Sequence, residues 1–314
     1  MRNDSTKAAT KSRKVAESIL AAHGDSLPSS HRQCSWAWND VWIRPKRVLR
    51  VANTDYTGLA VEAILAPSLP SLVGHPSVLA SGKTKGRCWI LQQRVSGKPL
   101  GALWEKLSAI EARSALCDLK SRLESLHALQ NVPPAIKDRE PTCYVIDPAH
   151  ANEVITKLFE RGSIDKAFAT SLRKIYRDFF AALAGQPVGA LHGDLHLYNA
   201  MYDPSKKAVT GIIDFEDCGY GPLELDYYML AKSVAETHQP GAVTWLRALL
   251  AGHLGQSGAK QRWHGYAVAR VLGRTAWDPE VDLDGEPDEH AMAELIDDLA
   301  SVAQGHHVGA LLLS

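Results

Sequence analysis

The sequence predicts an α+β fold in which a short, strand-rich region precedes a longer and mainly helical one. Between residues 33 and 93, short runs rich in Trp, Val and Ile alternate with polar residues, which is typical of half-buried strands. From residue 110 to residue 184, apolar side chains recur every three or four positions, which is typical of helices with one buried face. With 314 residues, 45% of them hydrophobic, the chain can bury one large core or two smaller ones.

The N-terminal part is expected to alternate short helices with strands. Helical spacing of apolar side chains indicates the helices, which end at Gly24 and Pro67, because Gly adopts left-handed turns and Pro cannot continue a helix. Turn residues at Pro45 and at 82–86 separate the strands. The expected elements, in chain order, are a helix over 11–23, strands over 33–52, a helix over 56–66, and strands over 78–80 and 88–93.

The C-terminal part is expected to be helical around two polar loops. Residues 94–100 break regular structure, and Pro133 and Pro134 begin an irregular insert that extends to about Pro148. The expected helices cover 110–129, 151–161 and 165–184, with more between 240 and 304.

Composition excludes several functional classes. The formal net charge is zero, so no global charge points to nucleic acid as a partner. The charge is uneven, because ten acidic residues and no Lys or Arg follow Arg274. The five cysteines are scattered and form no C-x-x-C pair, which favours neither a disulfide framework nor a zinc site and fits a reducing cytoplasm. No apolar run approaches the ~18 residues of a membrane span, so no membrane partner is expected.

Two polar loops carry the candidate chemistry. Residues 191–199 combine an acid, an amide and two imidazoles, and residues 212–217 hold three acids. A turn signal at 203–206 lies between them, so both loops should flank one hairpin. Asp194, Asn199 and Asp214 are then expected to converge. This set suits phosphoryl transfer, in which one carboxylate accepts a hydroxyl proton while an amide and a carboxylate hold magnesium. A polar hairpin with Asp and Asn as turn formers is the alternative.

The pattern His-x-Asp-x-x-x-x-Asn followed by Ile-Asp-Phe resembles the aminoglycoside phosphotransferase and choline kinase family, which has the protein-kinase-like fold. His192, Asp194, Asn199 and Asp214 match this pattern position for position. The resemblance implies an O-phosphotransferase that uses ATP or GTP together with Mg²⁺. It also implies a bilobal chain with an N-terminal extension over 1–30, a small antiparallel-sheet N-lobe over 31–95, and a mainly helical C-lobe over 96–314.

In this resemblance, Asp194 is the catalytic base, and Asn199 and Asp214 are the oxygen ligands of Mg²⁺. The chemistry agrees, because a positioned carboxylate takes the proton of an alcohol and Mg²⁺ prefers hard oxygen ligands. Supporting hydrogen bonds around the loop are expected from His192, His196 and Asp226.

The nucleotide is expected to contact the N-lobe. Alternation along 47–52 favours Arg50 as the phosphate-binding cation, with Glu62 as its carboxylate partner, while Lys46 and Arg47 stay open as alternatives. The other expected nucleotide contacts are Ser35 and Asn39 in a Trp-rich hairpin over the phosphates, and the backbone of Gln93 and Val95 between the lobes.

The acceptor is expected to be a small molecule, because Gly193 replaces the Arg of protein kinases and the segment from Asp214 to Asp226 is too short to dock a peptide. The acidic C-terminal region favours a cationic acceptor, such as an aminoglycoside or a basic peptide antibiotic, and hence antibiotic resistance. A choline- or homoserine-like metabolite kinase and a catalytically silent nucleotide-binding scaffold are the alternatives, and either a monomer or a homodimer fits. Acceptor contacts are expected from Glu216, Asp217, Trp277 and Asp278, although Glu216 and Asp217 could instead add to the outer shell of the metal.

Overall fold

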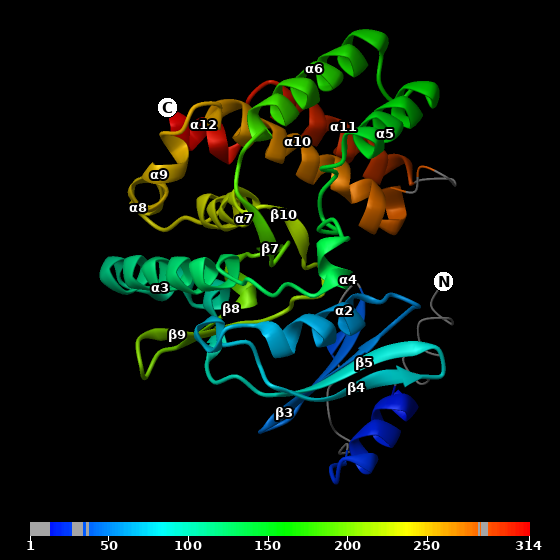
Figure 1. The fold of residues 1–314 in the computed structure, drawn as a ribbon, viewed down its shortest axis with the longest axis vertical. Coiled ribbons are helices and arrows are strands. Elements are labelled where there is room, and N and C mark those ends of the chain that lie inside the picture. Colours follow the sequence, from blue (N-terminus) through cyan, green and yellow to red (C-terminus); the bar gives the residue numbers. More distant parts are fainter. Residues whose placement is uncertain (1–12, 27–33, 36–37, 282, 284–287) are drawn as a thin grey trace.

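The computed structural model describes residues 13–26, 34–35, 38–281, 283 and 288–314, without the side chains of residues 34, 35, 276, 277 and 279. Figure 1 shows an antiparallel sheet near the N-terminus beside a larger helical region, as the sequence predicts. The strand order is β1-β2-β3-β5-β4, and all neighbours are antiparallel. The strands are β1 (Cys34–Ser35), β2 (Asn39–Ile43), β3 (Arg47–Ala52), β4 (Val78–Thr84) and β5 (Arg87–Gln93).

Different helices cover the two faces of this sheet, because successive residues of β3 point to opposite sides. Leu49 and Val51 pack against the apolar side of a helix over residues 13–22. Ala52, on the other face, belongs to a cluster with Leu59 of α2 (Gly58–Leu65). In Figure 1 these two helices lie on opposite sides of the sheet. The alternation therefore directs Arg50 toward α2.

The rest of the chain is mainly helical and surrounds two small antiparallel ladders. Its helices are α3 (Ala109–His127), α4 (Pro134–Lys137), α5 (Pro148–Glu160), α6 (Lys166–Leu183), α7 (Glu224–Ala235), α8 (Ala242–Leu249), α9 (Ala251–Leu254), α10 (Ala259–Trp277), α11 (Glu289–Ala303) and α12 (Val308–Leu313). Its strands are β6 (Lys98–Pro99), β7 (Val188–Leu191), β8 (Ala200–Asp203), β9 (Ala208–Ile212) and β10 (Gly219–Pro222). Short 3₁₀ turns cover Ala66–Ser68, Ser71–Val73, Leu100–Ala102, Trp104–Lys106, Leu197–Asn199 and Pro279–Val281.

The long helices lie where the periodicity predicts them. A reciprocal capping box between Ser108 and Glu111 begins α3, and its buried face joins the main hydrophobic core. The segment expected to be irregular, 133–148, contains the single turn of α4. The division into lobes expected at residue 95 falls just after β5 and stays a prediction. No helix in the described part of the chain is both long enough and apolar enough to cross a membrane.

The two ladders position the polar loops. In one ladder Leu191 of β7 pairs with Gly219 of β10, and in the other Ala200 of β8 pairs with Ile212 of β9. Residues 192–199 therefore run from one ladder to the other, and residues 213–218 run back. The two loops flank the β8–β9 hairpin side by side, as the turn signal predicts.

Candidate active site

Asp226, at the start of α7, holds the first loop in place. Its carboxylate accepts hydrogen bonds from the backbone N–H groups of His192 and Gly193, both at 3.0 Å, and contacts His127 Nε2 at 3.0 Å. Gly193 has a φ of +86°, and a Cβ there would lie 2.2 Å from the Asp217 carbonyl oxygen. The sequence after β7 therefore folds into a tight loop that only glycine permits at this point.

We expect Asp226→Ala to destabilise the protein by about 3 kcal/mol, because two buried N–H groups and an imidazole lose their acceptor together. Urea unfolding followed by circular dichroism measures the change in the free energy of unfolding. The matched control is Asp178→Ala, which removes an exposed pair with Lys174 and should change it by no more than about 0.5 kcal/mol. Equal effects of the two changes would contradict a role for Asp226 in fixing the loop.

The buried His192 ties the first loop to the second. Its Nε2 donates to the Ile213 carbonyl oxygen at 2.9 Å, and its Nδ1 accepts from the Asp194 N–H at 3.2 Å. The ring lies 4.5 Å from that of Phe215. These contacts use both ring nitrogens, so His192 braces the loops.

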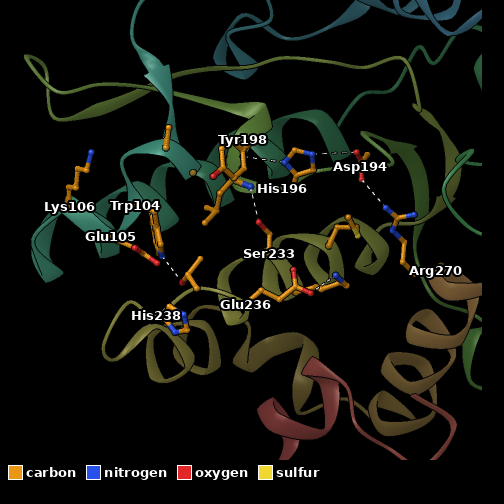
Figure 2. Close-up of a pocket in the computed structure, with 16 residues that line it drawn as sticks. Trp104, Glu105, Lys106, Asp194, His196, Tyr198, Ser233, Glu236, His238 and Arg270 are labelled. Carbon is orange, nitrogen blue, oxygen red and sulfur yellow. Dashed lines mark hydrogen bonds and ion pairs between the residues drawn. The ribbon is translucent and has the colours of Figure 1, made fainter. Parts of the chain in front are cut away.

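Asp194 lies two residues after His192 in the first loop. Its backbone carbonyl accepts from Asn199 Nδ2 at 3.0 Å, while His196 Nε2 lies 3.5 Å from Oδ2 and an Arg270 nitrogen lies 3.8 Å from Oδ1 (Figure 2). Burial raises the pKa of Asp194, but His196 and Arg270 outweigh it and hold that pKa below its usual value. Asp194 is therefore a carboxylate at neutral pH.

Asn199 and Asp214 lie on neighbouring backbone segments. The Ile213 N–H donates to the Asn199 carbonyl at 2.9 Å, and Asp214 follows directly with a φ of +71°. The Asn199 amide nitrogen is used by the Asp194 carbonyl, so its side-chain oxygen is the atom left to hold a cation. One amide oxygen and one carboxylate on adjacent loops form a hard donor set that fits Mg²⁺.

Arg50 lies at the centre of a buried network of carboxylates. One of its nitrogens bonds Glu62 at 2.7 Å, and the other bonds Glu216 at 2.7 Å and also Asp214. Glu62 in turn accepts from Gln92 at 2.7 Å. Burial raises the pKa of Glu62, but Arg50, His75 and Gln92 together outweigh it and bring that pKa to about 2. Arg50 of β3 and Glu62 of α2 therefore form the ion pair that the sequence predicts.

Glu216 belongs to this network. Its carboxylate accepts from Arg50 and from Asn39 Nδ2 of β2, so it faces the sheet. From its sequence position, Glu216 is expected either at the acceptor or in the outer shell of the metal, because the side-chain direction after the left-handed Asp214 does not follow from alternation. Burial and the nearby charge of Asp214 raise the pKa of Glu216 to about 8.

We expect the contribution of Glu216 to the free energy of unfolding to fall as pH rises from about 4.5 to 8, because the folded protein holds a proton on Glu216 that the unfolded chain releases. One pKa unit corresponds to about 1.4 kcal/mol, so the slope should be measurable by urea unfolding at several pH values. Glu216→Gln should flatten this slope, whereas Glu153→Gln, in an exposed pair with Lys157, should retain it. A slope that is unchanged in Glu216→Gln would show that another group causes it.

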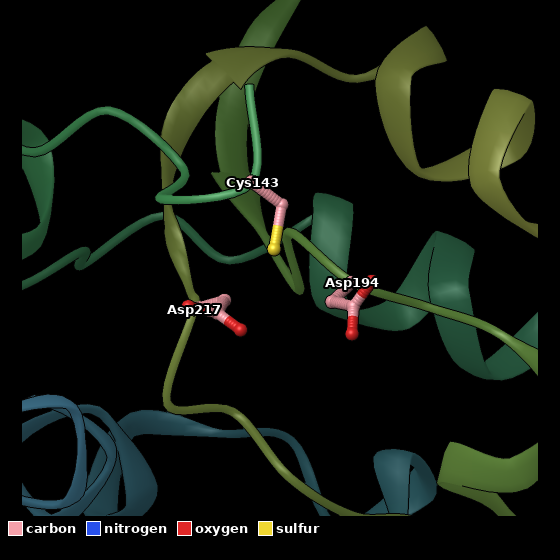
Figure 3. A group of neighbouring side chains, drawn as sticks. All are labelled: Cys143, Asp194 and Asp217. Carbon is pink, nitrogen blue, oxygen red and sulfur yellow. The ribbon is translucent and has the colours of Figure 1, made fainter. Parts of the chain in front are cut away.

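Asp217, the residue after Glu216, bonds a different part of the chain. Its carboxylate accepts from the Tyr56 hydroxyl at 3.0 Å, and burial and Asp194 raise its pKa. The ligand atoms of Cys143, Asp194 and Asp217 all lie within 4.8 Å of one another (Figure 3). A guanidinium nitrogen of Arg270 is 3.8 Å from Asp194. Because this positive charge would repel a divalent cation, the cluster of Cys143, Asp194 and Asp217 does not fit one.

The sequence also matches the model of a known protein family. Residues 46–267, more than half of the chain, match the model of the phosphotransferase enzyme family (APH). The chain belongs to this family. This membership confirms the expectation that the protein is an enzyme, a small-molecule kinase. No curated protein sequence matches this phosphotransferase.

Solved structures of other phosphotransferases share its fold. The GDP complex of aminoglycoside 2'-phosphotransferase-IIIa is 15% identical, with 91% of this chain and 96% of that chain covered, at a TM-score of 0.66. The streptomycin–ATP complex of APH(2")-IIa is 15% identical, with 96% and 97% covered, at 0.64. A thermostable mutant of APH(4)-Ia without ligand is 14% identical, with 95% and 98% covered, at 0.62. These likenesses confirm the expected protein-kinase-like fold.

The phosphotransferase has a cavity of about 680 Å³ on the helical side of Asp194, which we call the acceptor cavity (Figure 2). Asp194 is part of its wall, and so is His196. None of its other lining residues was predicted from the sequence: Leu197 and Tyr198 belong to the same loop, and the rest come from helices and turns elsewhere in the chain. They are Gly101, Ala102, Trp104, Glu105, Lys106, Leu197, Tyr198, Met229, Lys232, Ser233, Glu236, Thr237, His238 and Arg270.

Of the other predicted site residues, Asp278 lies away from the cavity, and the rest stay predictions or are already hydrogen-bonded. Asp278 pairs with Arg274 at 3.1 Å and is not among the residues that line the acceptor cavity. The side chains of Ser35 and Trp277 lie outside the described part of the structure. The Gln93 N–H donates to the Ser77 carbonyl at 2.8 Å, so it is already used within the sheet. The backbone of Val95, just beyond β5, stays a proposal for the nucleotide base.

Proposed function

We propose that the protein transfers the γ-phosphoryl group of ATP or GTP to a hydroxyl of a small molecule, with Asp194 as the general base. The observation that carries this proposal is the position of Asp194. Its carboxylate lines the acceptor cavity on one side, and its loop adjoins Asn199, Asp214 and the Arg50 network on the other. An acceptor in the cavity and a nucleotide under the sheet would therefore meet at this residue.

In the reaction, the acceptor oxygen attacks the γ-phosphorus while Asp194 takes the hydroxyl proton. The bond from the γ-phosphorus to its bridging oxygen breaks, and the nucleoside diphosphate leaves with the electron pair. Arg50 neutralises phosphate oxygens, and Glu62 keeps its guanidinium in place. Mg²⁺, when held by Asn199 and Asp214, neutralises charge between the outer phosphates.

The Arg50 guanidinium is surrounded by carboxyl groups that a nucleotide could replace. Arg50 contacts three acidic side chains. Two of them, Asp214 and Glu216, come from the second loop, and Asp214 is also the proposed Mg²⁺ ligand. The phosphate oxygens of a nucleotide accept hydrogen bonds from a guanidinium as these two carboxyl groups do, so a triphosphate would replace them while Glu62 stays in place. Asp214 would then be free to hold Mg²⁺ together with Asn199.

Two acceptor classes enter the proposal. The solved relatives are named as aminoglycoside phosphotransferases, which favours a cationic antibiotic and a resistance role. The acceptor cavity favours a hydroxylated metabolite, because its three acids, Glu105, Asp194 and Glu236, are balanced by Lys106, Lys232 and Arg270. We expect a cytoplasmic location, where nucleotide and Mg²⁺ are supplied.

The decisive experiment incubates the protein with ATP or GTP, Mg²⁺ and a panel of hydroxylated acceptors, and detects phosphorylated products by mass spectrometry. The panel should include aminoglycosides, a basic peptide antibiotic, choline, homoserine and sugars. A product that depends on both nucleotide and acceptor supports a kinase. Nucleotide binding without any product and without nucleotide turnover would favour the scaffold alternative.

A further inference from the structure

The wall of the acceptor cavity nearest to Asp194 is cationic. Arg270 comes from the middle of α10, and a guanidinium nitrogen lies 3.8 Å from Asp194 Oδ1 (Figure 2). The same guanidinium lies over the ring of Tyr144, 5.9 Å from its centroid, and donates to the Cys143 carbonyl at 3.4 Å. Its side chain stays 20% exposed on the cavity wall. A fixed positive charge therefore lies beside the place where the acceptor hydroxyl must bind.

The other charges on this wall do not provide a site for a polycation. Lys232 and Glu236 lie one helical turn apart on α7 and pair with each other. Of the other charged residues, Glu105 and Lys106 are of opposite sign, and Arg270 lies 3.8 Å from Asp194. The Lys, Arg, Asp and Glu charges of the wall therefore cancel, and an acceptor with several ammonium groups would find no excess of negative charge here.

We propose that the acceptor carries an anionic group, a carboxylate or a phosphate, close to the hydroxyl that is phosphorylated, and that Arg270 binds this group. A guanidinium stays charged at any working pH, and its planar donor fork matches both kinds of anion. Arg270 also offsets the repulsion between such an acceptor and the Asp194 carboxylate. This inference rests on the proposed function, since it takes the cavity beside Asp194 as the acceptor site.

Four hexoses that differ in one substituent test the charge preference. Glucose is neutral, glucuronate carries a carboxylate, glucose 6-phosphate carries a phosphate, and glucosamine carries an ammonium group. Binding is ranked by calorimetry with a non-hydrolysable nucleotide and Mg²⁺, and transfer is followed by mass spectrometry. We expect at least one anionic hexose to exceed glucose about tenfold, with glucosamine below glucose. The better of the two anions distinguishes a carboxylate site from a phosphate site.

A variant series assigns the preference to Arg270. Arg270→Gln should reduce the ratio of kcat/KM, or of affinity, between the anionic and the neutral hexose by about 10- to 100-fold, and Arg270→Lys should keep part of it. The matched control is Arg274→Gln, one turn further along α10, whose guanidinium pairs with Asp278 outside the cavity. This control should keep the wild-type ratio.

The outcomes separate this inference from the proposed function. If glucose, glucosamine or kanamycin binds or reacts better than both anions, or if Arg270→Gln leaves the ratio unchanged, the anionic acceptor is wrong. Asp194-dependent transfer to any acceptor would then still support the kinase. If wild type transfers phosphate to no acceptor and turns over no nucleotide, the proposed function fails, and the inference fails with it.

Discussion

Asp194→Asn should lower kcat for phosphoryl transfer by about 10²- to 10⁴-fold and change nucleotide affinity little. Asparagine keeps the size and polarity of the side chain, but it cannot accept the hydroxyl proton. The nucleotide-side contacts of Arg50, Glu62 and Asp214 do not involve the Asp194 carboxylate, so they should persist. Steady-state kinetics with a responsive acceptor measures the loss of kcat, and calorimetry with a non-hydrolysable nucleotide measures the affinity.

The control for this change is Asp203→Asn, at the exposed turn of the same hairpin, where the carboxylate accepts from the Ser205 N–H at 3.0 Å. This variant should keep kcat close to that of the wild type. If Asp194→Asn retained more than one tenth of kcat, Asp194 would not be the base, and the hydroxyl proton would have to leave by another route. A parallel loss of nucleotide binding would instead indicate a damaged fold.

Asp214→Asn should abolish the contribution of Mg²⁺ to nucleotide binding and lower kcat by about 10³-fold, since a metal at the phosphates is worth several kcal/mol of charge stabilisation. The amide carries no charge and is a weak cation ligand. Arg50 still has Glu62 and Glu216 in this variant, so the network should hold. Calorimetric titration of ADP with and without Mg²⁺ gives the metal-linked gain in affinity directly.

Asp217→Asn is the matched control, because Asp217 lies on the same loop but bonds Tyr56 rather than Arg50. We expect it to keep the Mg²⁺-linked gain that Asp214→Asn loses. The same gain in all three proteins would place the metal on other residues. A loss in both variants would mean that the whole loop, rather than one carboxylate, determines metal binding.

The sequence by itself determined which polar groups of the two loops come together. Asp194 and Asn199 lie five positions apart in one loop, and a turn signal leads directly to Asp214, so local spacing and turn chemistry suffice to bring them together. Alternation within one strand likewise predicted the direction of Arg50, since side chains of a strand point to opposite faces in turn. The partner Glu62 followed from the next helix along the chain, and the structure pairs it with Arg50 at 2.7 Å.

Only the tertiary structure decided the environment of these groups. Arg270 reaches Asp194 because α10 packs beside the catalytic loop, and no local pattern encodes a contact between residues so far apart in the chain. Glu216 turned toward the sheet because it follows a left-handed residue, where alternation no longer predicts direction. Spacing along the chain thus specified which polar groups meet in the two loops, whereas the packing of distant helices specified the charges that surround Asp194.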